Sequence, residues 1–237
     1  MAFPIVQSIG VSVESANTNS HTVSMASGVS SGDLILLLII MDGARDFEAG
    51  TIDDYTLILR TNRGSDNSNR CYFKVADGSE ATFEITLTVG NVERSIIYAL
   101  RISGAHASTA PEAAGAQDFF TPADSPVLSP SWGGAEDVLW VISSSYEDTT
   151  GAGYIINGYP TNYSSNQHDN NTGPADEKPQ GVMATRTAAA GSENPAAWPD
   201  NASGNSARWA AHTIAVRPAA AGAVLPVFMN QYRQRMA

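Results

Sequence analysis

The hydrophobic pattern centres on one stretch, Gly32–Met41 (GDLILLLIIM), and on its echo 104 residues later, Glu136–Ser145 (EDVLWVISSS). Laid over each other without a gap, the two stretches place Leu34 on Val138. Both apolar runs are too short for an ordinary helix and are rich in branched side chains. Each therefore predicts a central strand that is covered on both faces.

The echo continues on either side of these runs, which predicts a chain built from two similar halves. The matched pieces are Tyr55 with Tyr159, Ala76–Glu80 (ADGSE) with Ala189–Glu193 (AAGSE), and Ala99–Ser103 (ALRIS) with Ala215–Ala219 (AVRPA). We therefore divide the chain into a β-sandwich over residues 1–218 and a C-terminal linker and tail over residues 219–237. Within the sandwich, pseudo-repeats at 22–104 and 126–218 are joined by an irregular connector at 105–125.

Strict alternation of apolar and polar residues marks a further strand, in which Phe83, Ile85, Leu87 and Val89 share one face. Short apolar segments separated by Gly, Ser and Asn predict the other strands, and no segment favours a helix. The turn after the strand Tyr55–Thr61 is expected to run through Asn69, and the segment 146–180 is expected to be a polar loop. The pattern predicts an all-β, jelly-roll-like β-sandwich, and leaves open whether the halves form one sandwich or two small domains.

Composition limits the classes of partner and the location expected for the protein. The formal net charge of -11 repels phosphate backbones, so nucleic acid is not expected as a partner. Cys71 is the only cysteine, which excludes an intrachain disulfide, and its place in CYFKV predicts a buried structural thiol. The longest apolar run, Leu34–Met41, is too short to span a membrane as a helix, and the N-terminus lacks the pattern of a secretory signal. We expect a protein that is made in a cytoplasm and is soluble there, with no membrane partner.

Candidate chemistry is sparse. His21, His106, His168 and His212 are scattered without the close spacing of a metal pair, and no motif for nucleophilic catalysis or phosphate binding occurs. We therefore predict no catalytic residues, no metal site and no cofactor. Two groups of carboxylates leave calcium binding or a glycosidase pair open, without the spacing of a known calcium loop. They are Asp42, Asp46, Glu48, Asp53 and Asp54 in one group and Asp169, Asp176 and Glu177 in the other.

Two further features could bind partners. Aromatic residues beside the loops of the second copy, chiefly Tyr159, Tyr163 and Trp198, could stack on sugars, or could simply close the end of a sandwich. The tail is basic and apolar, and it either docks on a partner or folds back on its own domain. Its candidate docking residues are Leu225, Phe228, Tyr232, Arg233 and Arg235.

Three segments, Ser31–Leu38, Tyr72–Glu80 and Tyr98–Gly104, carry a resemblance to β-sandwich surface proteins of tailed-bacteriophage virions. The resemblance implies a non-enzymatic structural protein of the virion, made in the host cytoplasm. It points to a capsid decoration or cement protein that binds the capsid or other virion proteins. The alternative is a spike, tail-fibre or carbohydrate-binding module that recognises host glycans, and a depolymerase is the third option. Because sheet edges without abundant lysine invite pairing, a homo-oligomer is expected, a trimer before a dimer.

Overall fold

The structure is a computed structural model that describes residues 3–119, 121–133, 137–148, 156, 158–170, 179–199 and 207–220. These residues form strands and connecting loops, so the predicted all-β class is confirmed. The strands are β1 (Ile5–Thr18), β2 (Ser20–Val23), β3 (Leu34–Met41), β4 (Thr56–Arg63), β5 (Asn67–Val75), β6 (Phe83–Thr86), β7 (Glu93–Ser103), β8 (Glu112–Phe119), β9 (Asp137–Asp148), β10 (Ser164–Asn170), β11 (Pro179–Ala189) and β12 (Ala207–Val216).

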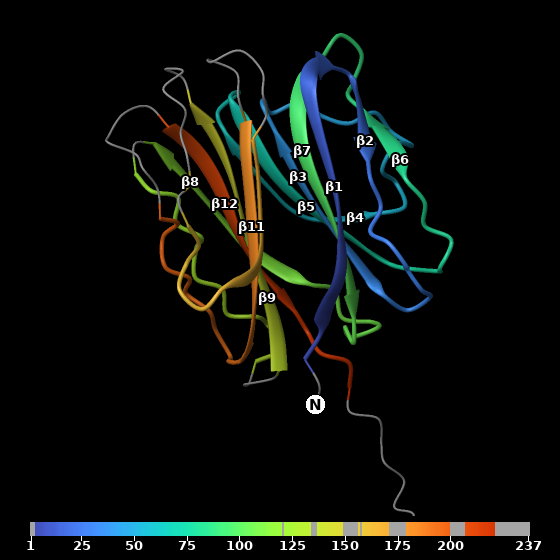
Figure 1. The fold of residues 1–237 in the computed structure, drawn as a ribbon, viewed down its shortest axis with the longest axis vertical. Coiled ribbons are helices and arrows are strands. Elements are labelled where there is room, and N and C mark those ends of the chain that lie inside the picture. Colours follow the sequence, from blue (N-terminus) through green and yellow to red (C-terminus); the bar gives the residue numbers. More distant parts are fainter. Residues whose placement is uncertain are drawn as a thin grey trace, which may run out of the picture.

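Two antiparallel sheets of five strands pack face to face as a β-sandwich (Figure 1). The first sheet has the order β1-β7-β3-β5-β4, and the second has the order β10-β11-β9-β12-β8. The two apolar runs become β3 and β9, which lie in the middle of their sheets as predicted. A run without a polar face requires this position, because only a central strand is covered on both faces.

The two halves of the chain share one topology. Read from the first strand of each half, the sheets run β1-β7-β3-β5-β4 and β8-β12-β9-β11-β10, so each strand has a counterpart with the same neighbours. The small sheet of β2 and β6 also has a counterpart. Leu128 pairs with Glu193, and the Trp198 amide donates to the Ala123 carbonyl in the same antiparallel register. Each structural half therefore begins earlier than the repeat seen in the sequence, at β1 and at β8.

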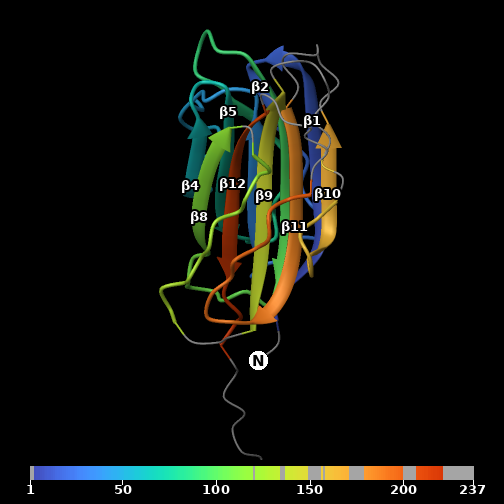
Figure 2. The same cartoon turned by 90° about the vertical axis from the view of Figure 1, so that its left-hand side faces the viewer.

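The facing strands show how the halves are related. β4 contacts β8, β5 contacts β12, and β7 contacts β11. The equivalent strands of the two halves therefore run across the sandwich in opposite directions. Figure 2 shows the same arrangement, with β4 beside β8 at one margin and β1 near β10 at the other. An approximate twofold axis along the strands accounts for this order, and it turns the inner face of one sheet onto the inner face of the other.

This symmetry corrects the gapless alignment of the two runs. Leu34 and Leu36 point into the core between the sheets, together with Leu139 and Val141. Val138, by contrast, lies on the outer face of the second sheet. Pairing Leu34 with Val138 therefore matches an inner residue with an outer one, and the true correspondence is displaced by one residue. A shift of one residue in a strand moves every side chain to the other face.

Three apolar clusters hold the layers together. The cluster between the sheets includes Leu38 and Tyr98 from the first sheet and Met183 from the second. A second cluster lies between the first sheet and the β2–β6 pair, and a third covers the outer face of the second sheet. Each half thus has an outer core of its own, and the shared core joins the halves into one sandwich. The finer term jelly-roll-like stays a prediction, because a jelly roll has eight strands in two Greek keys.

Several local predictions are wrong. The connector at 105–125 contains β8, and the expected polar loop 146–180 contains β10. The turn expected through Asn69 ends earlier, since β5 begins at Asn67. The alternation that begins at Phe83 ends at Leu87, because Val89 is 89 % exposed. These segments form or end strands through contacts with distant neighbours, which local pattern does not encode.

Candidate functional site

A hollow of about 520 Å³ lies on the outer side of the first sheet. One wall is the loop 50–55 between β3 and β4, and the other is the segment 79–84 that leads into β6. Lys74 of β5 lies between these walls. Tyr55 and Phe83, one from each wall, stack with ring centroids 5.5 Å apart and planes 15° from parallel. The hollow thus combines an aromatic pair with several carboxylates and one ammonium group.

Lys74 and Glu80 form an ion pair inside the hollow. The Lys74 ammonium lies 3.2 Å from the Glu80 carboxylate, whose side chain is almost fully buried, and 5.9 Å from the centre of the Tyr55 ring. Desolvation raises the pKa of Glu80, but hydrogen bonds from the Asp77 and Gly78 amides and from Lys74 outweigh it, and the pKa is lowered. Burial, with the charges of Glu80 and Asp54, raises the pKa of Tyr55 to about 12. At neutral pH the hollow therefore holds an ionised Glu80 and a protonated phenol.

The second half contains a related set of a tyrosine, a basic residue and a glutamate. Tyr163 precedes β10 as Tyr55 precedes β4, and the amide of each donates to the carbonyl three residues earlier. The Tyr163 hydroxyl donates to Glu193 over 3.2 Å, and Arg186 donates to the same oxygen over 2.8 Å. Glu193 and Arg186 thus stand where Glu80 and Lys74 stand in the first half. The match of ADGSE with AAGSE in the sequence had paired Glu80 with Glu193. The gapless alignment was wrong for the tyrosine: it paired Tyr55 with Tyr159, whereas the structural counterpart is Tyr163.

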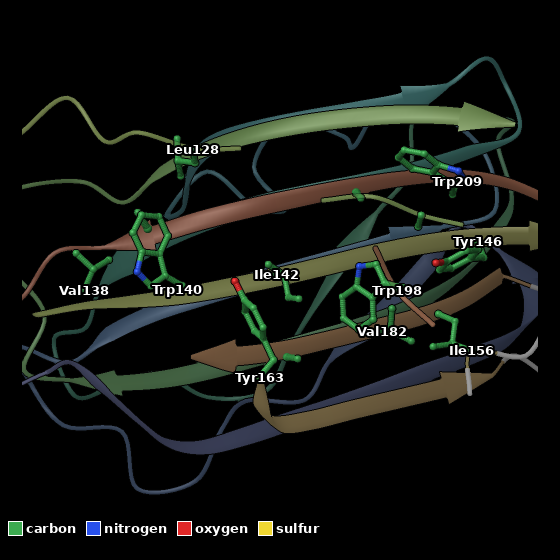
Figure 3. Packing of buried hydrophobic residues seen from close by; sticks show 14 residues of the cluster. Leu128, Val138, Trp140, Ile142, Tyr146, Ile156, Tyr163, Val182, Trp198 and Trp209 are labelled. Atoms are coloured by element: carbon green, nitrogen blue, oxygen red, sulfur yellow. The ribbon is translucent and has the colours of Figure 1, made fainter. Parts of the chain in front are cut away.

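The two arrangements differ in how deeply their tyrosines are buried. Tyr163 is 8 % exposed, and it lies in the outer core of the second sheet with Trp140 and Trp198 (Figure 3). Burial, followed by the charge and hydrogen bond of Glu193, raises the pKa of Tyr163. Tyr55 is only half-buried and borders the open hollow. The first half thus holds an open arrangement of these residues, and the second half holds a closed one.

The three aromatic residues predicted to bind sugars lie close together but are mostly covered. Trp198 is 1 % exposed, and its indole nitrogen donates to Ser125 over 3.2 Å. Tyr159 packs edge-on against Trp198 with ring centroids 6.1 Å apart, and it is only partly buried. A platform for sugar needs an open ring face, and Trp198 and Tyr163 instead pack in the core on the outer face of the second sheet.

Two carboxylates of the acidic loop after β3 form ion pairs with arginines. Asp42 lies 3.4 Å from Arg94, and Asp46 pairs with Arg60. Within the described residues, no group of three or more His, Cys, Asp or Glu side chains is arranged to hold a metal ion. The second acidic group is split: Asp169 lies in β10, whereas Asp176 and Glu177 lie outside the described residues.

The buried titratable residues act in packing. Cys71 is fully buried, and burial raises the pKa of its thiol, which confirms the predicted structural thiol. His212 is fully buried, and burial lowers its pKa to about 3. Burial likewise lowers the pKa of His21, whose Nδ1 lies 2.8 Å from the Ser95 hydroxyl. Both imidazoles are therefore neutral structural groups at neutral pH.

The five candidate docking residues of the tail, Leu225, Phe228, Tyr232, Arg233 and Arg235, lie outside the described residues. No helix in the described part of the chain is long and apolar enough to cross a membrane.

Comparison with known proteins gives no match to any protein-family model, to any characterised protein or to any solved structure. The likeness to phage virion proteins therefore stays a prediction from residue patterns.

The hollow itself was not predicted from the sequence. The signal that could have pointed to it is the pair of matched acids, Glu80 and Glu193, each preceded by a basic residue at a similar distance, Lys74 and Arg186. Repetition of a charged pair in both halves indicates a structural contact. It does not indicate which copy stays open, because that depends on packing by distant segments.

Proposed function

We propose that the protein is a non-enzymatic structural component of a bacteriophage virion, a capsid decoration or cement protein that binds the capsid shell. The observation that carries the proposal is the duplicated sandwich. Two halves of one topology, related by an approximate twofold axis, present related surfaces in two directions. One copy of the protein can therefore contact two neighbouring subunits of a shell. The residue patterns shared with virion surface proteins support the same assignment.

Electron microscopy of the source particle tests this proposal. We expect density for the sandwich at regular positions on the capsid surface. Density confined to the tail, or no density on purified particles, would overturn the capsid assignment.

The C-terminal tail is proposed as the anchor. Deletion of residues 224–237 is expected to lower occupancy on particles, because it removes the apolar and basic residues together. The double substitution R233A/R235A separates the two contributions: retained binding would assign the anchor to the apolar residues. Normal occupancy of the deletion variant would show that the tail is not the anchor.

A second candidate function is recognition of host surface glycans, as a spike, tail-fibre or carbohydrate-binding module. The hollow beside Tyr55 favours it, because concave sites with aromatic and carboxylate linings suit small polar ligands. A glycan array with the full chain tests this function. Absence of saturable binding to any immobilised glycan would exclude it.

A further inference from the structure

We propose that the hollow beside Tyr55 binds an uncharged pyranose sugar. This proposal rests on the second candidate function, glycan recognition, and moves its site from the loops of the second half to the outer side of the first half. The ligand class follows from the size, lining and charge of the hollow.

The size fits a sugar. A hollow of about 520 Å³ lies within the range of about 300–1,000 Å³ that is typical of small-molecule sites in proteins. Its two walls come from separate loops on either side of Lys74, so a bound ring would contact both the loop after β3 and the segment before β6.

The lining suits a ligand with both apolar and hydroxyl surfaces. Ile52, Tyr55 and Phe83 supply apolar and aromatic carbon, on which the C–H face of a pyranose can pack. Asp53 and Asp54 are exposed at the rim, and neither carboxylate makes a hydrogen bond or ion pair within the described part of the chain. Ionised carboxylates are acceptors only, and sugar hydroxyls are the donors that they can take up.

The charge of the lining selects against acidic sugars. Asp53, Asp54, Glu80 and Glu84 line the hollow against the single cation Lys74, which already pairs with Glu80. A carboxylate or sulfate on the ligand would face like charges. The hollow therefore favours neutral hexoses and N-acetylated hexosamines over sialic or uronic acids.

The closed copy shows what distinguishes the open one. In the second half, the equivalent Tyr163 and Glu193 are 8 % and 6 % exposed, and this arrangement belongs to a filled core. The first half retains the tyrosine, the basic residue and the acid but leaves a hollow beside them.

Saturation-transfer NMR with the full chain tests the proposal. The probes are glucose, galactose, rhamnose and N-acetylglucosamine, with glucuronic acid and sialic acid as charged comparisons. We expect saturable binding of at least one neutral sugar and binding at least tenfold weaker for the acidic sugars. Failure of every neutral probe to bind at millimolar concentration would overturn the proposal, as would a preference for the acidic sugars.

Variants locate the site. D53A/D54A alters exposed side chains at the rim and is expected to weaken sugar binding at least tenfold without changing the thermal midpoint. The matched control is D118A, which removes an exposed acid from β8 on the other sheet. Binding that survives D53A/D54A but is lost in Tyr159→Ala would place the site in the second half and overturn the assignment.

Particle occupancy separates this proposal from the capsid function. The D53A/D54A variant is expected to occupy particles normally, since the proposed anchor is the tail. Loss of occupancy in this variant would show that the hollow contacts the particle, and would overturn the sugar assignment. Loss of sugar binding alone leaves the capsid function untouched.

Discussion

Gly115 lies where β8 of the second sheet packs against β4 of the first. A Cβ at this position would lie 2.2 Å from the Thr61 hydroxyl and 3.0 Å from a Leu59 methyl group. Both neighbours are side chains of a strand in the facing sheet, and turning the Thr61 hydroxyl away would break its contact with His212 Nε2. We expect Gly115→Ala to lower the free energy of unfolding by about 1–3 kcal/mol, measured by urea denaturation.

Gly158→Ala is the matched control for this prediction. Its new Cβ would meet a Pro199 carbon at 3.6 Å, which is ordinary van der Waals contact. The change is expected to stay within about 0.5 kcal/mol of the parent. Equal effects of the two substitutions would contradict the close approach at Gly115.

His212 is a buried residue whose titration affects stability. Its imidazole is buried beside Gly115, with Nε2 3.0 Å from the Thr61 hydroxyl. Burial lowers its folded-state pKa to about 3, below the usual value of 6.5. Between these two values the unfolded chain binds a proton that the folded chain does not. The stability conferred by neutral His212 is therefore present above pH 6.5 and is lost as the pH falls toward 3.

The expected effect is a difference in the slope of the unfolding free energy against pH. Below pH 6.5 the parent should lose up to about 1.4 kcal/mol per pH unit more than His212→Gln, measured by urea denaturation from pH 7 to pH 4. Identical slopes for the parent and His212→Gln would show that another group dominates the acid response.

At the scale of elements, the paired Tyr, cation and Glu arrangements join the strands to the loops that cover them. In the second half, Glu193 follows β11 and accepts hydrogen bonds from Arg186 of β11 and from Tyr163, which directly precedes β10. Glu193→Gln leaves the partly buried Arg186 without its counter-charge. We expect a loss of about 1–3 kcal/mol of unfolding free energy, measured by chemical denaturation.

Asp118→Asn is the control for the Glu193 substitution. Asp118 is an exposed acid, and its recorded hydrogen bond is a local one from the Phe119 amide. Its replacement should change stability by less than about 0.5 kcal/mol. Comparable losses in both variants would argue against a structural role for the Glu193 contacts.

At the scale of the whole molecule, the two margins of the sandwich differ. At one margin β4 and β8 contact each other, and the Phe119 ring lies under the Arg63 guanidinium at 3.1 Å. At the other margin β1 and β10 are the edge strands, and β1 exposes Ile5 and Val13. Lys74 and Lys178 are the only lysines in the sequence, so no lysine lies on β1 to discourage pairing there.

We therefore expect a closed homo-oligomer, a trimer before a dimer, formed through the β1 side. Light scattering at micromolar concentration should give a multiple of the 24.9 kDa chain mass. Substituting lysine for Ile5 and Val13 together should shift the mass toward the monomer, since charge at a strand edge opposes pairing. A monomeric parent protein would remove this prediction.

The sequence by itself determined the strands that carry strong pattern. The branched run in β3 and its echo in β9 require central positions, and the duplicated order of segments implies two halves of one topology. Burial of Cys71 also followed from alternation. These predictions succeed because run length, side-chain branching and alternation are local properties, which a sequence records directly.

Tertiary structure decided the rest. The face that each residue presents depends on register, and a one-residue displacement between the copies was invisible in a run that is apolar on both sides. β8 and β10 are polar or made of small residues, and they become strands only because β12 and β11 offer edges to pair with. The hollow beside Tyr55 needs loops about thirty residues apart to meet over β5, and the burial of Trp198 needs the segment near Ala123 to cover it. Such contacts depend on the path of the whole chain, so local pattern cannot specify them.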